Sequence, residues 1–423
     1  MFSAEAPIIV IGAGGAGILA ARRAAERGCP VLVLERNRKP GIKLLVSGGG
    51  KCNITHVGTV DDVQTGFPTR EARFLKPALH RFGNRDIIRI LEHEGVATFA
   101  RPDGRIFPAS GRAADVVEAL TLPLRRMSVT IQLNTHVEDI TAQGDQITGV
   151  VASGRHLPSR HVILATGGVS YPKTGTTGDG YAWAQKLGHT VVPLRPALAP
   201  ISLEPTVPPA WRGVALRGGR LSVFTLGRTI TRWDGDILFT HEGISGPAAL
   251  EVSRAAAVAM EHAEVRLLFD AVPARGFAAL DADLEAAIRG HPHRLVGSVL
   301  EGIFPRRLLA ALLGHAGLDP ARRCGNLTRN ERRALAHVLK SWDLGRITSI
   351  DIERGEVTAG GVHLSEVDPH TMNSRKVRGL YLCGEVLDVA GRVGGYNLQA
   401  AFSTGFVAGD AAADAWLAAP GGH

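Results

Sequence analysis

The stretch SGGGKCN, residues Ser47–Asn53, places a lysine, a cysteine and an amide directly behind three glycines. Bare glycine backbone allows a close approach, so the stretch suits a phosphate loop, a metal site, a thiol nucleophile or a loop against a flat ring. A Walker phosphate loop is excluded, because Cys52 stands where Ser or Thr is required and Leu45 stands where a glycine is required. We expect no metal site either, since ligand partners at suitable spacing are lacking.

Two interpretations of Cys52 stay open. Lys51 could lower the pKa of the neighbouring thiol and make Cys52 a nucleophile. The alternative is a small buried thiol that only packs. The other cysteines, Cys29, Cys324 and Cys383, form no CxxC pair, so we expect free thiols in a reducing cytoplasm.

A dinucleotide-binding unit is predicted at the N-terminus, in PIIVIGAGGAGILAARRAAERGCPVLVLER. Ile8–Ile11 is an apolar run typical of a strand buried on both faces. Gly12, Gly14 and Gly17 form G-x-G-x-x-G, which permits a turn, admits a pyrophosphate and lets the next helix lie on the sheet. Glu35 ends the following strand, where it could accept hydrogen bonds from the ribose hydroxyls of an adenosine.

Two further glycine turns point to the same edge of the predicted sheet. In HVILATGGVSYP a buried strand leads to Gly167 and Gly168, and in GLYLCGEVLD another leads to Gly384. Ligands of open α/β sheets bind at the carboxyl ends of the strands, so Glu385 and Asp388 are expected beside the dinucleotide. Simple helix capping is the alternative for both carboxylates.

A resemblance to a known family extends over nearly the whole chain. It is carried by GIKLLVSGGGKCNIT, GRIFPASGRAADVV, TGDGYAWAQKLGHTVVPLRPALAPI, LFTHEGISGPAAL, VTAGGV and GLYLCGEVLDVAGRVGGYNLQAAFSTG. These blocks resemble a bacterial family of FAD-dependent flavoproteins, which includes aminoacetone-oxidase-like and bile-acid-reductase-like NAD(P)/FAD-dependent oxidoreductases. The resemblance implies a Rossmann-like, two-part FAD-binding domain with an inserted substrate domain. Lys51 departs from the family, which more often has arginine there.

The resemblance also implies which residues hold FAD. Glu385 would bind the ribityl chain, and Asn397, Leu398 and Gln399 would bind the pyrimidine edge of the flavin. The N-terminal amides of an alanine-rich helix, from Leu398 to about Trp416, would favour the reduced ring. The predicted FAD-binding residues are Gly12, Gly14, Gly17, Glu35, Arg36, Lys43, Ser47, Gly48, Gly49, Lys51, Cys52, Asn53, Gly167, Gly168, Gly384, Glu385, Asp388, Asn397, Leu398 and Gln399.

The middle of the chain predicts an inserted domain in an α/β protein. Runs such as LSVFTL and TITRW are typical of small antiparallel strands, whereas LDADLEAAIRG, PRRLLAALLGHAG and RNERRALAHVLKSW predict helices. We therefore expect a small β-barrel-like part and a helical part. The predicted boundaries are 1–192 and 358–423 for the FAD-binding domain, 193–275 for the β-rich part, 276–340 for the helical part and 341–357 for the return strand.

The sequence offers four unranked candidates for a catalytic side chain. His241, in FTHEGISGP, could move protons near neutral pH, with a structural hydrogen-bonded role as the alternative. Tyr171 and Tyr396 carry phenols that could donate to a substrate carbonyl. Cys52 is the fourth candidate.

Composition favours a cytoplasmic protein with a small-molecule substrate. The 423 residues are 45% hydrophobic and carry a net charge of +8. The basic residues are scattered without a compact tract, so no nucleic-acid partner is expected. The N-terminal apolar run has no basic segment before it and is too short for a bilayer, which indicates neither a signal peptide nor a membrane partner. Composition leaves the oligomeric state undetermined.

The expected reaction is hydride transfer between a small organic substrate and flavin N5. The sequence contains no second G-x-G-x-x-G at a strand-to-helix turn, so NAD(P)H would act as a transient donor at the flavin rather than in its own domain. Two reactions stay open: NAD(P)H-driven reduction of an activated C=C bond, and oxidation of a small amine or amino-ketone with oxygen as acceptor. A flavin-containing RNA-modifying protein and a redox-sensing protein are the alternatives.

Overall fold

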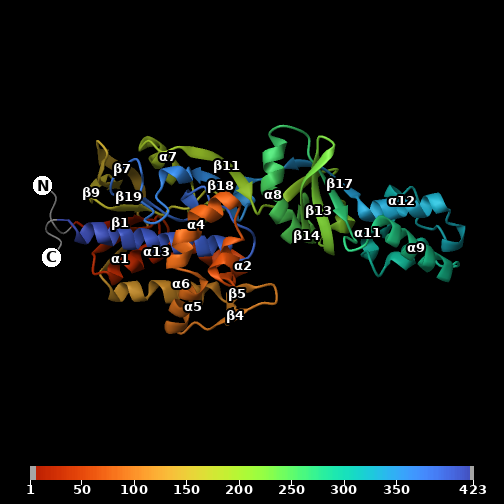
Figure 1. The fold of residues 1–423 in the computed structure, drawn as a ribbon, viewed down its shortest axis with the longest axis horizontal. Helices are drawn as coiled ribbons and strands as arrows, with labels where there is room; N and C mark the ends of the chain where they lie inside the picture. Colours follow the sequence, from red (N-terminus) through yellow and green to blue (C-terminus); the bar gives the residue numbers. More distant parts are fainter. Residues whose placement is uncertain (1–5, 420–423) are drawn as a thin grey trace. The chain divides into compact units, whose positions relative to one another are not determined.

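The chain forms two compact units, and the computed structural model describes residues 6–419 of it (Figure 1). Unit 1 combines Met1–Leu194 with Glu356–His423, and unit 2 is Arg195–Gly355. The chain therefore leaves unit 1 once and returns to it once, as in a domain inserted into another.

The centre of unit 1 is a parallel sheet in the order β19-β10-β1-β2-β6. Its strands are β19 (Leu380–Leu382), β10 (Val162–Leu164), β1 (Ile8–Ile11), β2 (Val31–Leu34) and β6 (Val129–Gln132). All residues of β19, β10 and β1 are buried, which explains their continuous apolar sequences. Parallel pairing brings the carboxyl ends of these strands to one edge.

Two helices lie in close contact on this sheet. Helix α1 (Gly15–Glu26) follows β1 and packs along α13 (Tyr396–Leu417), the helix that the C-terminal sequence predicts. Glycine permits the contact, because a Cβ on Gly405 would lie 2.2 Å from the carbonyl oxygen of Ala16. A larger residue at Gly405 would push the two helices apart.

A buried carboxylate fastens α13 to α1 and to α4 (Thr69–Arg81). Asp410 accepts hydrogen bonds from Arg23 at 2.7 Å and from Arg27 at 2.9 Å, and it also pairs with Arg81. Burial acts to raise the pKa of Asp410, but the bonds from the arginines outweigh it and hold the pKa below its usual value. No sequence signal indicated this cluster.

We expect Asp410→Asn to lower the free energy of unfolding by about 3 kcal/mol at neutral pH, because the arginines lose a buried counter-ion. The folded-state pKa is depressed, so the stabilisation is complete above the unfolded-state pKa of about 4 and is lost as the pH falls through the folded-state value. Urea unfolding of wild type and variant, at neutral pH and in acid below the unfolded-state pKa, measures the difference in stability. The difference between them should shrink in acid, and a difference that grew would contradict the role given to Asp410.

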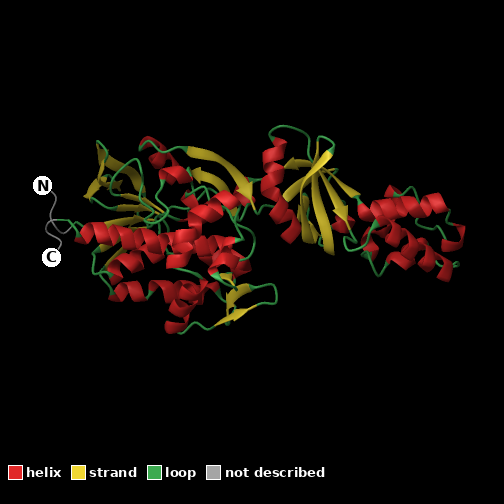
Figure 2. Cartoon of the chain, in the orientation of Figure 1, coloured by secondary structure: helices red, strands yellow, loops and turns green. Residues whose placement is uncertain are grey.

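The other elements of unit 1 flank the central sheet (Figure 2). They include the antiparallel sheets β3-β5-β4 and β7-β8-β9 and the pair β11-β18. The strands are β3 (Thr55–His56), β4 (Thr98–Ala100), β5 (Arg105–Pro108), β7 (Val137–Gln143), β8 (Gln146–Ala152), β9 (Arg155–Pro158), β11 (Val191–Ala197) and β18 (Val357–Val362). The helices are α2 (Ile42–Gly50), α3 (Val60–Gln64), α5 (Asn84–His93), α6 (Ala113–Thr121) and α7 (Asp179–Lys186).

Unit 2 begins with a closed barrel in the order β12-β15-β14-β13-β16-β17. Its strands are β12 (Ile201–Glu204), β13 (Ala215–Thr225), β14 (Arg228–Phe239), β15 (Gly243–Ser245), β16 (Arg266–Asp270) and β17 (Trp342–Ser349), and α8 (Pro247–Met260) packs on β13 and β14. The expected short strands between Val214 and Thr240 are instead one long hairpin, because β13 and β14 pair along their length.

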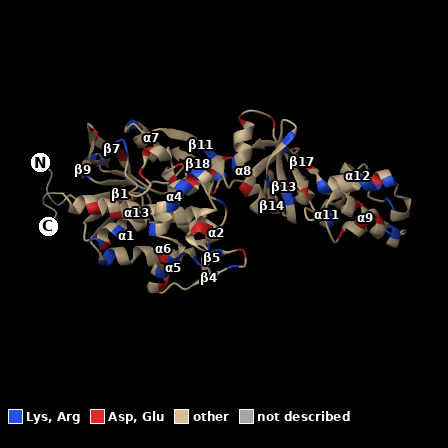
Figure 3. Ribbon diagram, viewed as in Figure 1, with Lys and Arg blue, Asp and Glu red and all other residues tan. Residues whose placement is uncertain are grey.

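Four helices lie between β16 and β17 in the sequence and form the helical part of unit 2. They are α9 (Phe277–Gly290), α10 (Val296–Leu300), α11 (Arg306–His315) and α12 (Arg329–Lys340). Trp342 is buried beside Phe304, with ring centroids 5.3 Å apart, so barrel and helices share a core. The predicted fold class, with a β-barrel part and a helical part in the insert, is confirmed. Charged residues of both signs are spread over each unit (Figure 3).

Candidate functional site

Glycine and carboxylate turns from four strands meet at the carboxyl edge of the parallel sheet. Gly12 follows β1, Glu35 follows β2, Gly167 lies beyond β10 and Gly384 lies beyond β19. These strands pair in register and in parallel, so the four turns lie next to one another although they are far apart in sequence. This is the edge where open α/β sheets bind their ligands.

The G-x-G-x-x-G turn has the geometry of a dinucleotide site. Gly12 has a φ of +99°, and a Cβ there would lie 2.7 Å from the carbonyl oxygen of Ala165. A Cβ on Gly17 would lie 1.9 Å from the carbonyl oxygen of Gly12, so α1 rests directly on the turn. A Cβ on Gly14 would meet no described atom within 4 Å. The open space beside Gly14 fits a phosphate group.

Glu35 is fixed beside this turn by two backbone amides. Its Oε2 accepts from the amide of Ala13 at 2.7 Å, and its Oε1 accepts from that of Asn37 at 2.8 Å. The side chain of Arg36 instead pairs with Asp179 at 3.0 Å. The contact of Glu35 with a ribose stays a prediction.

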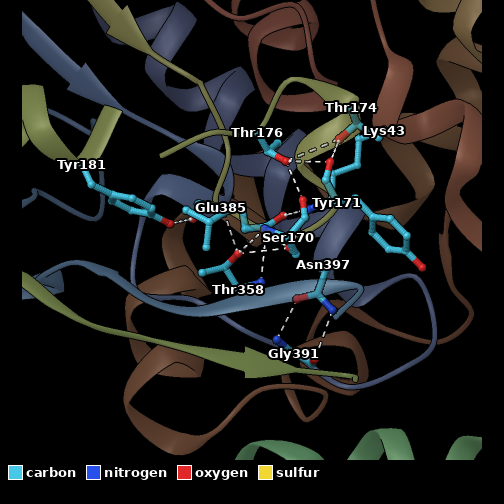
Figure 4. Close-up of polar contacts among 11 residues, drawn as sticks. Lys43, Ser170, Tyr171, Thr174, Thr176, Tyr181, Thr358, Glu385, Gly391 and Asn397 are labelled. Carbon is cyan, nitrogen blue, oxygen red and sulfur yellow. Dashed lines mark hydrogen bonds and ion pairs between the residues drawn. The ribbon is translucent and has the colours of Figure 1, made fainter. Parts of the chain in front are cut away.

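Glu385 is the centre of a polar network (Figure 4). Its Oε2 binds the ammonium group of Lys43 at 2.6 Å. Its Oε1 accepts from the hydroxyl of Ser170 at 3.0 Å and from the backbone amide of Thr358 at 2.9 Å. A Cβ on Gly168 would lie 2.3 Å from the hydroxyl oxygen of Thr358, so the network requires glycine there. Three parts of the chain thus hold one carboxylate at the sheet edge.

Three members of this network were not predicted from the sequence. Ser170 and Thr358 are 188 positions apart, and their hydroxyl oxygens lie 3.1 Å from each other. Tyr181 donates to the carbonyl oxygen of Glu385 at 3.1 Å, and burial raises the pKa of its phenol, so it stays neutral. A signal was present for Thr358, which stands in the VTAGGV block. The glycines of that block suggested its importance, but the contacts with Ser170 and Glu385 are made by the hydroxyl group and the backbone amide of Thr358.

The SGGGKCN stretch is a bare turn at the end of α2. Ser47 has left the helical conformation, and Gly48 and Gly49 have φ values of +57° and +67°. A Cβ on Gly48 would lie 2.9 Å from the backbone nitrogen of Asn53. The Oδ1 atom of Asn53 is buried and has no hydrogen-bond partner among the described residues. An unpaired buried acceptor is costly, so this atom suits the polar edge of a bound ring.

Cys52 is buried inside this turn and is not activated. Burial raises the pKa of its thiol to about 11, and the hydroxyl of Ser47 offsets this only in part. The open interpretation in which Lys51 lowers the pKa of this thiol is not supported, because burial dominates and Lys51 is exposed to solvent. The structure therefore supports the interpretation of a packed thiol.

We expect Cys52 to resist iodoacetamide in the native protein at about pH 8, because almost no thiolate is present at that pH. After denaturation it should react like an ordinary cysteine. Peptide mass spectrometry identifies the modified position, and Cys52→Ala serves as the control for its peptide. Rapid native modification of Cys52 would contradict the packing role.

The first turn of α13 is held by its own side chains. Asn397 accepts from the amide of Gly391 at 2.7 Å and donates to its carbonyl oxygen at 3.0 Å. Gln399 is fully buried and accepts from the hydroxyl of Thr55 at 2.7 Å, so its side chain is not available to the flavin edge. The expectation that the side chain of Gln399 binds the pyrimidine edge of the flavin is therefore corrected. Contacts from Asn397 and Leu398 would use the free amides of the first helical turn.

The other predicted residues differ in their surroundings. Tyr396 stacks on a histidine ring with centroids 4.9 Å apart, and Tyr171 is 40% exposed with a φ of +53°. His241 is exposed in unit 2, between β14 and β15. Asp388 is buried and pairs with Arg70. These surroundings leave Tyr171, Tyr396 and His241 unranked as catalytic candidates.

Residues 6–419, the described part of the chain, contain neither a metal centre nor a membrane-spanning helix. In that range no three His, Cys, Asp or Glu side chains are placed to hold a metal ion. None of the helices described there is long and apolar enough to cross a membrane.

A dinucleotide cofactor fits the features at the sheet edge. These are the open space beside Gly14, the backbone amides at the starts of α1 and α13, and the unpaired Oδ1 atom of Asn53.

Comparisons with known proteins agree over nearly the full length. The family model described as HI0933-like protein Rossmann domain matches residues 6–411. The 3-dehydro-bile acid delta(4,6)-reductase of Clostridium scindens is 33% identical over 96% of this chain and 98% of its own. The ribosomal RNA dihydrouridine synthase of Escherichia coli is 32% identical over 94% of this chain and 95% of its own.

A solved structure shares the fold. The 3-ketosteroid delta1-dehydrogenase from Sterolibacterium denitrificans superposes on 96% of this chain and 99% of its own, with a TM-score of 0.53 and 16% identity. At that identity the likeness concerns the fold alone. The expectation that nucleic acid is not a partner finds no support, since two relatives that match nearly full length are named for ribosomal RNA.

Proposed function

We propose that this chain, which belongs to the HI0933-like family of FAD-dependent oxidoreductases, reduces a carbon–carbon double bond conjugated to a carbonyl group. The membership confirms the predicted cofactor, FAD, and the predicted class of enzyme. The electron donor, the substrate and the individual FAD contacts are proposals.

One observation carries the reaction type: two full-length relatives are named for reductions of the same chemical kind. A 3-dehydro bile acid with a double bond at position 4 contains an enone. Dihydrouridine is uridine whose ring double bond, also conjugated to a carbonyl, has been reduced. Both reductions add a hydride to the carbon β to the carbonyl and a proton to the α carbon. Neither of these relatives is named for amine oxidation.

The residues of the site support this chemistry by binding and orientation. FAD, when bound, supplies hydride transfer at N5 of its ring. We assign the pyrophosphate to the turn at Gly14 and the adenosine ribose to Glu35. Glu385, held by Lys43, would orient the ribityl chain, and Asn53 would accept from the polar edge of the ring. The amides at the start of α13 would stabilise negative charge on the reduced cofactor.

NAD(P)H is the donor that we propose. The reduction needs a hydride from outside the protein and a proton from water, and a nicotinamide supplies the hydride. The visible spectrum of the purified protein, recorded anaerobically before and after NADPH and then NADH, tests this. Bleaching of the flavin bands supports the proposal. Bands that persist with both nucleotides, together with peroxide formation from an amine, would replace it by the oxidase reaction.

Uridine in RNA is the substrate that we favour. The chain has 48 Lys and Arg against 40 Asp and Glu, and this positive balance suits a polyanion. A steroid-like enone is the second candidate, because the bile-acid reductase is as similar to this chain as the RNA enzyme is.

Product analysis distinguishes the two substrates. The protein and NADPH are incubated with in vitro transcribed ribosomal RNA, which is unmodified, or with a 3-oxo-4-ene bile acid. Mass spectrometry then detects the gain of two hydrogen atoms, in uridine or in the bile acid. A Gly14→Ala variant, expected not to hold FAD, is the matched control. If NADPH bleaches the flavin and neither substrate gains hydrogen, both substrate proposals fail.

A further inference from the structure

The helical part of unit 2 contains three arginine pairs, and the two members of a pair have different surroundings. They occur in PRRL, ARRC and ERRA, at 306–307, 322–323 and 332–333. In the last two pairs the first arginine is neutralised. Arg322 binds Glu331 at 2.8 Å, and Arg332 binds Asp281 at 2.8 Å and Glu285 at 3.1 Å. Glu331, Asp281 and Glu285 are thus already engaged by these first arginines.

The second arginine of each of these pairs is exposed and unneutralised. Arg323 and Arg333 have no carboxylate oxygen within 4 Å among the residues that the structure describes, and the same holds for Arg294 and Arg329. The hydrogen bond from Arg332, with the charges of Arg333 and Arg329 beside it, holds the pKa of Asp281 below its usual value. The single negative charge of Asp281 therefore offsets only part of the positive charge of Arg329, Arg332 and Arg333.

Arg294, Arg323 and Arg329 lie on neighbouring segments of the helical part, which the ion pair of Arg322 with Glu331 joins, and Arg333 follows one turn after Arg329. The amide of Cys324 donates to the carbonyl oxygen of Arg294 at 2.9 Å, and a β-bridge joins Leu295 to Arg323. Helix α12 starts at Arg329, directly after this bridged segment. Its other end leads into the barrel strand β17, so Arg329 lies at the end of α12 away from that strand, and the guanidinium group of Arg333 lies over the ring of Phe277, 5.8 Å from its centroid. We call Arg294, Arg323, Arg329 and Arg333 the arginine tip.

We propose that the arginine tip binds phosphate groups of an RNA strand. Guanidinium groups match phosphate oxygens in a two-pronged geometry, and unneutralised exposed arginines attract a polyanion by charge alone. The inference rests on the proposed RNA substrate. A uridine in RNA belongs to a long chain of phosphates, so a second surface can hold the strand apart from the reacting base, whereas a bile acid has no phosphate for this surface.

The experiment measures binding of a fluorescent, in vitro transcribed ribosomal RNA fragment to the FAD-loaded protein by polarisation, at low and at moderate salt. The variants are R294E/R323E and R329E/R333E. The matched control is R125E/R126E, which makes the same charge change at two exposed arginines of unit 1. We expect roughly ten-fold weaker binding and a smaller salt dependence for each tip variant, with a much smaller loss for the control.

Further measurements distinguish the outcomes that would overturn the arginine tip from those that would overturn the RNA substrate. Thermal unfolding and bleaching by NADPH should match wild type in every variant. Should a charge reversal prevent folding, R294Q/R323Q replaces it with the same expectation. Equal RNA binding by tip and control variants overturns the arginine tip while the RNA substrate stands. A wild-type protein that binds no RNA at low salt overturns both. Binding to anionic phosphatidylserine vesicles in place of RNA would also overturn the proposal.

Discussion

Gly14→Ala is expected to cost the protein its FAD while leaving the apoprotein stable. Gly14 has a φ of −78° and a ψ of −175°, which alanine adopts, and an added Cβ would meet no described atom within 4 Å. The substitution should therefore lower the free energy of unfolding by no more than about 1 kcal/mol, the range for an N-cap change. If the pyrophosphate fills that space, the added methyl group must collide with it, and FAD affinity should fall at least about ten-fold.

Gly17→Ala is the matched control for this prediction. Its added Cβ would lie 1.9 Å from the carbonyl oxygen of Gly12, so α1 must move away from the sheet with or without cofactor. We expect a loss of about 3 kcal/mol in the stability of the apoprotein itself. Flavin content from the visible spectrum and urea unfolding of the apoproteins give both quantities. A Gly14→Ala protein with normal flavin content would contradict the pyrophosphate assignment.

Glu385→Gln is expected to reduce both stability and FAD retention. The side chains of Glu385 and Lys43 are 18% and 24% exposed, and the variant leaves the ammonium group of Lys43 without its counter-ion. Breaking such a partly buried pair should cost about 2 kcal/mol in the free energy of unfolding. FAD retention should fall as well, because Lys43 and the segment at Ser170 lose the group that positions them.

A double variant separates these two effects. Lys43→Met with Glu385→Gln removes both charges and keeps similar volumes, so apoprotein stability should return toward wild type. FAD retention should stay low if the ion pair itself positions the cofactor. A double variant that is stable and fully loaded with FAD would assign the pair to folding alone. The flavin-to-protein absorbance ratio after gel filtration, with urea unfolding, measures both properties.

The dinucleotide turn could be predicted because its signal is local. A buried strand, three glycines, a helix, a second strand and Glu35 follow one another within thirty residues, and each has a backbone requirement that few residue types meet. The turns at Gly167 and Gly384 were likewise visible as glycines that end buried strands. Their meeting at one edge followed from the rule for parallel sheets, and β10 and β19 pair as that rule requires.

The direction of individual side chains was decided by packing between distant segments. Gln399 belongs to a recognisable block, yet it faces inward because Thr55 offers it a buried partner. Cys52 follows a lysine, yet burial controls its pKa. The sequence around each residue does not show whether its side chain is buried, since burial depends on which other element of the fold covers it.

The nucleotide-binding frame, the glycine turns and the family could be predicted from the residues alone, because they depend on local backbone geometry and on ordered motifs. Long-range packing, in contrast, brings Ser170, Thr358 and Tyr181 around Glu385 and arginines from two other helices to Asp410, and it leaves certain arginines of unit 2 unneutralised. One cause explains all three arrangements. Hydrogen bonds and ion pairs act over a few ångströms, and the fold sets which residues come that close.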